Sequence, residues 1–314
     1  MDGRAEAAVH VFFKWQHERR LTKERERFGC VIAAGCGDYS LAIRRDGSVA
    51  CWGYNIYGRA PPDGIPGDFV AIAAGDRHAL ALRRDGSVAC WGSNLNGKAP
   101  PAGVDGDFVA IAAGDDQSLA IRRDGSVAWW GSNLYGKAPP TSDDVDFVAI
   151  AGGHVHSLAL RRNGNIACWG NNRHGQAPPN GVDGNFVEIA AGSSHSLALG
   201  RDGSVACWGN NEHGQAPPDG IDGDFVAIAA GAAVHSLALG SDGSVACWGD
   251  NTYDQAPPDG LDGDFVEIAA GNVHSLALRR DGSIACWGYN YSGQAPPEGV
   301  VGPFFTHDRL TVTN

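Results

Sequence analysis

A tryptophan–glycine pair recurs along almost the whole chain. It occurs seven times, and successive tryptophans are separated by 39, 39, 39, 39, 40 and 39 residues. The tryptophans of these pairs are Trp52, Trp91, Trp130, Trp169, Trp208, Trp248 and Trp287. A fixed period of about 20–50 residues is typical of solenoids, propellers and other arrays of one structural unit. The 314 residues are therefore predicted to form one repeat architecture rather than two unrelated domains.

Each copy of the repeat has the pattern of short strands joined by turns. In the second copy, strand-like segments with apolar cores occupy residues 69–74, 80–84 and 87–92, and Asp85-Gly86 separates the last two segments. Asp-Gly between apolar runs predicts a β-hairpin, because these residues supply the positive φ of a tight turn. The Ala-Pro-Pro segment that follows predicts an edge or an outer connection, since proline lacks the N–H of a central strand. The 45 glycines and 16 prolines argue against a mostly helical protein.

The first strand of each copy is apolar on both of its faces. In 69–74 the sequence is Phe-Val-Ala-Ile-Ala-Ala, so alternate residues on either side are apolar. A strand of this kind belongs to a sheet that is covered on both faces. The many alanines indicate that neighbouring sheets approach closely. Small sheets stacked face to face predict a closed ring of blades.

Three motifs of the repeat resemble a known family. They are I-A-A-G-x-x-H-S-L-A-L, D-G-S-V-A-C-W-G and N-x-x-G-Q, and they extend over about residues 28–304. The unit resembles the repeat of the regulator of chromosome condensation family, which includes the related β-lactamase inhibitory protein II propeller. This resemblance implies an all-β, seven-bladed β-propeller with three or four short strands per blade.

The two ends of the chain lie at or beyond the limits of the repeat. Residues 1–27 are predicted to form an amphipathic helical extension, because apolar residues recur there at helical spacing before a charged run. Residues 28–314 are predicted to form the propeller, with a C-terminal strand or tail from about residue 304. Two segments compete for the first-strand position that closes the ring. We expect Cys30–Ala34 to occupy it and Phe305–Val312 to add an outer edge strand or to remain outside the sheet.

Charge and targeting signals restrict the partners of the chain. The formal net charge is −12, which disfavours nucleic acid as a partner because an acidic surface repels phosphate. No apolar run approaches the ~18 residues of a membrane span. The first twenty residues do not have the pattern of a signal peptide. We expect a monomer in the cytoplasm, with the nucleus as the alternative, and neither a cofactor nor a bound metal.

Cysteine and histidine each recur at one position of the repeat. Six cysteines precede the repeat tryptophan, and equivalent positions on adjacent blades are about a sheet-packing distance of ~10 Å apart, too far for a disulfide. We therefore expect buried free thiols. The histidines at the other position are predicted to make structural hydrogen bonds rather than to bind a metal. They are His78, His156, His195, His235 and His274, with Tyr39 and Gln117 in the remaining copies.

The copies differ from one another mainly in the loop that follows the tryptophan–glycine pair. Aromatic and arginine residues on rigid loops are typical of protein-binding surfaces, whereas the alternative is neutral variation in exposed loops. The candidate partner-binding residues are Tyr54, Tyr57, Leu134, Tyr135, Arg173, His174, Tyr253, Tyr289 and Tyr291. A second difference concerns the Arg-Arg pair after the second strand, which becomes Gly200-Arg201 and Gly240-Ser241 in two copies. That sector is less basic, and two interpretations are open: the difference orients a partner, or it matches acidic neighbours across blades.

The predicted function is a non-enzymatic scaffold for an unidentified protein partner. The sequence contains no nucleophile elbow, phosphate-binding loop or cysteine–histidine pair outside the repeat. The family resemblance implies two alternatives. One is a guanine-nucleotide exchange factor or regulator that acts on a small GTPase, and the other is an enzyme-inhibitory propeller.

Overall fold

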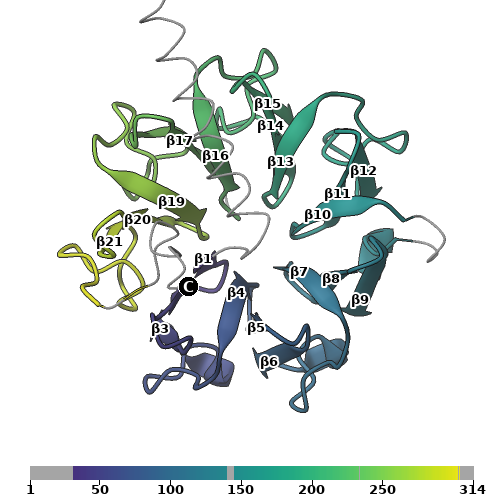
Figure 1. Cartoon of the computed structure of the whole chain (residues 1–314). Coiled ribbons are helices and arrows are strands. Elements are labelled where there is room, and N and C mark those ends of the chain that lie inside the picture. Colours follow the sequence, from purple (N-terminus) through teal and green to yellow (C-terminus); the bar gives the residue numbers. More distant parts are fainter. Residues whose placement is uncertain (1–30, 140–144, 233, 303, 305–314) are drawn as a thin grey trace, which may run out of the picture.

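Seven antiparallel sheets of three strands each surround a common centre in the computed structural model (Figure 1). The structure describes residues 31–139, 145–232, 234–302 and 304. Each sheet is one copy of the repeat, so the predicted seven-bladed propeller is confirmed. The blades are numbered here from 1 to 7 in chain order.

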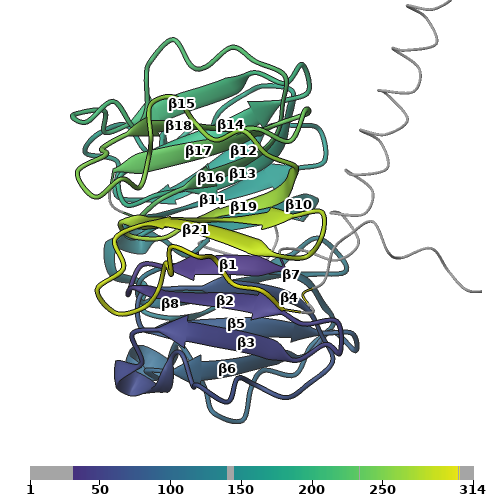
Figure 2. The same cartoon turned by 90° about the vertical axis from the view of Figure 1, so that its left-hand side faces the viewer.

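The three strands of each blade follow one another from the centre outwards (Figures 1 and 2). The first strands are β1 (Ile32–Gly35), β4 (Phe69–Ala74), β7 (Phe108–Ala113), β10 (Phe147–Gly152), β13 (Phe186–Ala191), β16 (Phe225–Ala230) and β19 (Phe265–Ala270). The middle strands are β2 (Tyr39–Ile43), β5 (His78–Arg83), β8 (Gln117–Arg122), β11 (His156–Arg161), β14 (His195–Gly200), β17 (His235–Gly240) and β20 (His274–Arg279). The outer strands are β3 (Val49–Gly53), β6 (Val88–Gly92), β9 (Val127–Gly131), β12 (Ile166–Gly170), β15 (Val205–Gly209), β18 (Val245–Gly249) and β21 (Ile284–Gly288). Single 3-10 turns follow three of the blades: η1 (Ile56–Gly58), η2 (Leu95–Gly97) and η3 (Leu134–Gly136).

The predicted Asp-Gly hairpins connect the middle and outer strands, with one difference in the turn. The Arg44 N–H donates to the carbonyl of Ser48 at 2.8 Å, which closes a three-residue loop. Only Gly47 has a positive φ, at 83°. Asp46 acts through its carboxylate instead, which accepts the Ser48 N–H at 2.9 Å. The loop is therefore a turn ending in one left-handed glycine, rather than a turn in which both residues are left-handed.

The middle strands form the core between neighbouring blades. In β5, residues 78–82 are all buried, and Leu80 has no exposed surface. The expectation that the first strands are buried on both faces is wrong at one position, because the pairing of β4 with β5 contains a bulge between Phe69 and Ala71. The corresponding bulges turn Val109 and Val148 outwards, and their exposed fractions are 46% and 44%.

The Ala-Pro-Pro segments lie at the outer edge of the blades, as predicted. After Pro61 and Pro62 in blade 1, Ile65 exchanges two backbone hydrogen bonds of 2.9 Å with Val49 at the start of β3. Five further blades make the same isolated bridge. Each of these blades thus carries a single residue pair where a fourth strand would begin.

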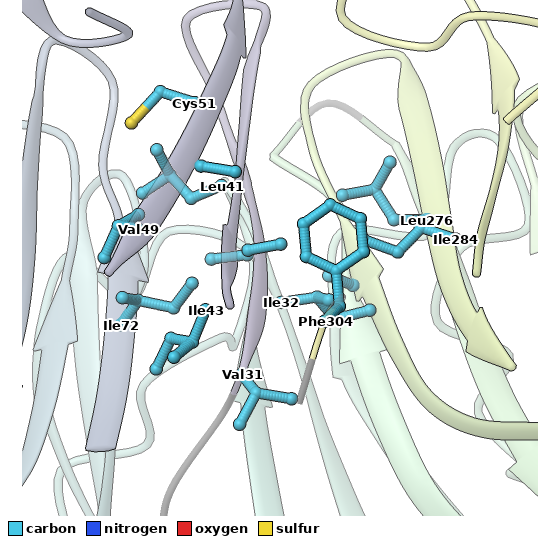
Figure 3. Close-up of a cluster of buried hydrophobic side chains, with 14 of the residues drawn as sticks. Val31, Ile32, Leu41, Ile43, Val49, Cys51, Ile72, Leu276, Ile284 and Phe304 are labelled. Carbon is cyan, nitrogen blue, oxygen red and sulfur yellow. The ribbon is translucent and has the colours of Figure 1, made fainter. Parts of the chain in front are cut away.

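Both ends of the described chain share the first-strand position of blade 1 (Figure 3). β1 pairs with β2, and Phe304 forms a bridge with Arg44 at the end of the same strand. The first copy has Cys30 where later copies have a phenylalanine, and buried Phe304 supplies the missing ring. The prediction that the segment ending at Ala34 takes this position is confirmed for its described residues, and Phe304 extends the position by one bridge. The predicted helix within 1–27 and the segment 305–312 lie outside the described residues.

A buried carboxylate from blade 7 also holds β1. Oε1 of Glu267 accepts the N–H groups of Val31 and Ile32 at 2.8 Å and 3.2 Å. Glu267 is 2% exposed and belongs to β19, the first strand of the last blade. The ring is thus closed by side-chain hydrogen bonds as well as by apolar packing.

Candidate protein-interaction face

The loops of the propeller lie on two opposite faces. We call the face with the loops after the tryptophan–glycine pairs the loop face. The turn between first and middle strands lies beside them, since the Ser93 N–H donates to the carbonyl of Arg77 at 2.7 Å. The Asp-Gly hairpin turns lie at the other ends of the strands, on what we call the turn face.

The blades are joined by one hydrogen-bonded unit that recurs around the ring. In the unit between blades 2 and 3, Nε2 of His78 lies 2.8 Å from Oγ of Ser118. The Ser118 hydroxyl donates to the carbonyl of Lys98 at 2.8 Å, and the Trp130 indole N–H donates to the same carbonyl at 2.9 Å. Histidine therefore makes the predicted structural hydrogen bond, and its partner belongs to the next blade.

Blade 1 is the exception, and two substitutions account for it. Tyr39 takes the place of histidine, and Ala79 takes the place of the serine that the ring would contact. The Tyr39 hydroxyl instead donates to the backbone carbonyl of His78 at 2.5 Å. The two departures from the repeat thus compensate one another across a single blade interface.

The buried thiols line the outer part of the same interfaces. Every cysteine among the described residues is a free thiol, as predicted. Burial raises the pKa of the repeat thiols, exemplified by Cys90 and Cys168, to about 12. They are therefore protonated, small apolar groups at neutral pH.

All nine candidate partner-binding residues lie on the loop face, but they form separate groups. Tyr253, Tyr289 and Tyr291 form one group across blades 6 and 7, which we call the tyrosine cluster. The rings of Tyr253 and Tyr289 meet edge to face at 5.1 Å, and those of Tyr289 and Tyr291 are stacked at 6.3 Å. Tyr291 is 87% exposed, whereas Tyr289 is half-buried beneath it.

Two arginines hold the tyrosines of blade 1. The guanidinium of Arg59 lies 4.6 Å from the ring centre of Tyr54, and that of Arg77 lies 5.7 Å from the ring centre of Tyr57. Cation–π contacts of this kind fix the ring orientation without covering its outer side. Tyr54 and Tyr57 remain exposed, as does Ile56 between them. Ile56 is not among the candidate residues predicted from the sequence.

The remaining candidates belong to other sectors of the loop face. Leu134 and Tyr135 are exposed on η3 in blade 3. Arg173 and His174 are exposed in blade 4, where Nδ1 of His174 lies 3.3 Å from Nδ2 of Asn210. The exposed apolar loop residues therefore follow blades 6, 7, 1, 2 and 3, with Leu95 in blade 2, whereas the loops of blades 4 and 5 are polar.

The residue after the loop glycine determines the loop conformation. In blades 4 to 7 this residue is a buried glutamine whose Oε1 accepts a loop N–H, as Gln255 does from Tyr253 at 2.8 Å. In blades 1 to 3 it is Arg59, Lys98 or Lys137, which has no acceptor. The loops there form the 3-10 turns, and Tyr57 and Tyr135 are left-handed with φ of 75° and 71°. The loop tyrosines therefore differ in backbone conformation: Tyr57 and Tyr135 are left-handed residues of 3-10 turns, whereas Tyr253 donates its N–H to a buried glutamine.

The three buried cations reach into the next blade. Nη1 of Arg59 donates to the carbonyl of Asp76 at 3.3 Å, and Nζ of Lys137 donates to the carbonyl of His154 at 3.2 Å. Lys98 makes an ion pair with Asp116. Burial opposes ionisation of Asp116, but the hydrogen bond and charge of Lys98 outweigh it and lower the pKa of the carboxyl.

These features define a seven-bladed propeller whose loop face presents aromatic side chains on a rigid scaffold. The regulator of chromosome condensation (RCC1) repeat model matches residues 69–98, 147–176, 186–215, 225–255 and 265–294. The chain therefore contains regulator of chromosome condensation repeats in blade 2 and in blades 4 to 7. No curated protein matches it in sequence.

Solved structures with a similar fold come from yeast and plants. Prp20p from Saccharomyces cerevisiae, a structure described with its binding properties to Gsp1p and histones, is 22% identical with a TM-score of 0.68, covering 86% of this chain and 84% of that one. The CRINKLY WD40 ectodomain of the Arabidopsis thaliana receptor kinase ACR4 is 23% identical with a TM-score of 0.68, covering 85% and 98%. The ectodomain of the Physcomitrella patens receptor kinase CR4 is 25% identical with a TM-score of 0.66, covering 82% and 73%.

The described part of the chain has only single 3-10 turns as helices, and none has the length and apolarity needed to traverse a lipid bilayer.

Proposed function

We propose that the propeller is a non-enzymatic protein-interaction scaffold that binds a protein partner through its loop face. The observation that carries this proposal is the tyrosine cluster of blades 6 and 7, in which Tyr291 is 87% exposed. Large aromatic rings that already rest on one another lose little conformational freedom when a partner covers them. Tyr54, Tyr57 and Ile56 continue the exposed apolar surface in blade 1. We expect a monomeric scaffold in the cytoplasm, or alternatively in the nucleus.

The test exchanges the tyrosines for residues that other copies of the repeat carry at the same positions. The triple variant Tyr54→Ser, Tyr289→Asn and Tyr291→Thr preserves loop chemistry that the fold already accepts, as in Ser93 and Asn171. Proteins that co-purify from native extract with the wild-type chain should be depleted at least tenfold with this variant. Val301→Ala removes an exposed apolar side chain outside the loops and is the matched control. Equal recovery with the triple variant and the control would exclude the loop face as the binding surface.

Exchange activity toward a small GTPase is the second proposal. It is supported by the matched regulator of chromosome condensation repeats and by the fold similarity to Prp20p, whose structure is described with its binding properties to Gsp1p. Release of a fluorescent guanine nucleotide from a panel of small GTPases tests it directly. If nucleotide release is accelerated by the wild-type chain but not by the triple tyrosine variant, the GTPase binds through the loop face. If no GTPase of the panel releases its nucleotide faster, the exchange proposal fails and only the scaffold proposal remains.

A further inference from the structure

On the turn face, an arginine covers the first phenylalanine of the blade in four of the seven blades. The guanidinium lies over the ring, and the phenylalanine beneath is only 3–4% exposed. The pairs and their distances to the ring centre are Arg83–Phe69 at 5.4 Å, Arg122–Phe108 at 5.7 Å, Arg161–Phe147 at 4.7 Å and Arg279–Phe265 at 5.2 Å. The same arginine also reaches the hairpin serine, since Nη1 of Arg83 donates to Oγ of Ser87 at 3.2 Å.

The adjacent blades 5 and 6 have the ring but not the arginine. Glycine stands at the arginine position, as Gly200 and Gly240. The phenylalanines beneath, Phe186 and Phe225, are half-buried rather than buried. The missing side chain therefore leaves part of each aromatic ring accessible on the turn face.

The carboxylates beside these rings also differ from those of the other blades. Hydrogen bonds from Ser87 and then the charge of Arg83 lower the pKa of Asp85 in blade 2. In blades 5 and 6, hydrogen bonds from Ser204 and Ser244 lower the pKa of Asp202 and Asp242, with no arginine contributing. The aromatic ring, hydroxyl and carboxylate that surround an arginine in blade 2 are thus all retained.

The second position of the Arg-Arg pair adds to the contrast in blade 6. Arg280 of blade 7 pairs with Asp264 at 3.1 Å, whereas in blade 6 Ser241 donates a hydrogen bond to Asp224 at 3.0 Å. In blade 5, Arg201 remains and donates to Asn185 at 3.3 Å. The sector therefore keeps one cation, in blade 5, and is most acidic in blade 6.

We propose that the turn face of blades 5 and 6 binds a basic segment of a partner protein, whose arginine side chains occupy the places over Phe186 and Phe225. In blades 2, 3, 4 and 7 the chain's own arginine fills this place. A planar guanidinium stacks on the ring and bonds to the hydroxyl and carboxylate beside it, which an ammonium group cannot do equally well. The site lies on the face opposite the tyrosine cluster and is independent of the partner proposed there.

The experiment measures binding of a synthetic peptide with two arginines in a glycine–serine sequence. Its matched controls carry lysine or neutral citrulline in place of arginine. Fluorescence anisotropy should show binding in the order arginine, lysine, citrulline, with a decline as salt is raised. Absence of binding by the arginine peptide, or equal binding of the citrulline peptide, would overturn the proposal.

Variants then locate the site. Gly200→Arg with Gly240→Arg supplies the missing arginines, and binding should fall at least tenfold. A Cβ at Gly200 would lie 2.5 Å from Oδ1 of Asp202, the end of a side chain that can rotate away. Phe186→Leu with Phe225→Leu removes the rings, keeps the apolar packing and should weaken binding similarly. Unchanged binding in either folded double variant would refute the assignment.

A gain-of-binding variant provides the reciprocal check. Arg122→Gly in blade 3 uncovers Phe108 and should add a further site for the arginine peptide, raising the number bound per propeller. Arg123→Gly removes the neighbouring arginine, which pairs with Asp107 at 3.0 Å instead of covering the ring, and is its charge-matched control. Equal stoichiometry for these two variants would count against recognition by the uncovered ring.

Discussion

At the scale of single residues, the hydrogen-bond pattern determines the tautomer of the interblade histidines. The Ser118 hydroxyl gives its only proton to the carbonyl of Lys98, so it can only accept from Nε2 of His78. Each of the other four imidazoles contacts a serine with the same arrangement. The proton therefore lies on Nε2, and the ring is neutral.

Burial of these histidines makes the stability of the folded propeller depend on pH. It lowers the pKa of His78, His156 and His235 to about 3 and that of His195 and His274 to about 4, from 6.5. As pH falls below 6.5 the unfolded chain takes up protons that the folded propeller excludes. The stabilising contribution of the neutral rings is thus complete above pH 6.5 and is lost progressively down to about pH 3–4.

We predict that the free energy of unfolding in urea is lower at pH 5.5 than at pH 7.5 by about 1.4 kcal/mol for each of these histidines. His235→Gln should remove one such increment, because the amide of Gln117 already makes the equivalent contact to Ser157 in blade 3. The free energy of unfolding, measured at both pH values for wild type and variant, checks this. An unchanged pH dependence in the variant would show that this imidazole takes up its proton without unfolding.

At the scale of elements, the sequence predicts strands better than it predicts loops and interfaces. The strands repeat their apolar pattern seven times, and the Asp-Gly turns mark their ends. The histidine partner was not predictable from spacing, because His78 and Ser118 are 40 residues apart and meet only once blades stack. The candidate tyrosines were found because they vary between copies, but their grouping depends on which blades adjoin.

The loop conformations depend on one residue that sequence analysis treated as part of the repeat. A buried glutamine side chain accepts a loop N–H, whereas a buried lysine or arginine cannot. The cation instead donates to the next blade, as Lys98 does to the carbonyl of Asp115 at 3.3 Å. The identity of this residue thus selects both the shape of the loop and its contact with the neighbouring blade.

Exchanging lysine for glutamine and glutamine for lysine at this position is predicted to lower the free energy of unfolding by unequal amounts. Lys98→Gln gives a side chain that four other blades accept, so it should change the free energy of unfolding by about 1 kcal/mol or less. Gln215→Lys buries an ammonium group where Val234 stands in place of Asp116. Unlike Lys137, whose charge is favoured by Asp115 and Asp116, it gains nothing from that carboxylate pair, so it should cost about 3 kcal/mol or more. Urea unfolding of both variants measures the difference. Equal losses would mean that the carboxylate is not what allows blade 2 to hold lysine.

At the scale of the whole molecule, stability depends on joining the last repeat to the first. β1 is four residues long, whereas the other first strands have six, so blade 1 has less backbone pairing of its own. Phe304 extends it with a bridge to Arg44, and its carbonyl accepts a hydrogen bond from Nε of Arg45 at 3.3 Å. The sequence identified both segments but could not divide the position between them, because a register shared by two segments does not say where one stops.

Phe304 is predicted to contribute strongly to the stability of the propeller, although it is the last residue of the described chain. Phe304 is 3% exposed and packs in the cluster formed by blades 7, 1 and 2, so Phe304→Ala should destabilise the propeller by about 3–5 kcal/mol. Phe186→Ala removes the equivalent ring of blade 5, which is half-buried and held within a continuous strand, and should cost less. Amide exchange in Phe304→Ala should accelerate first in β1–β3, since that blade loses the bridge. Uniform acceleration of amide exchange over all seven blades would instead indicate that the ring opens cooperatively and that Phe304 does not stabilise blade 1 locally.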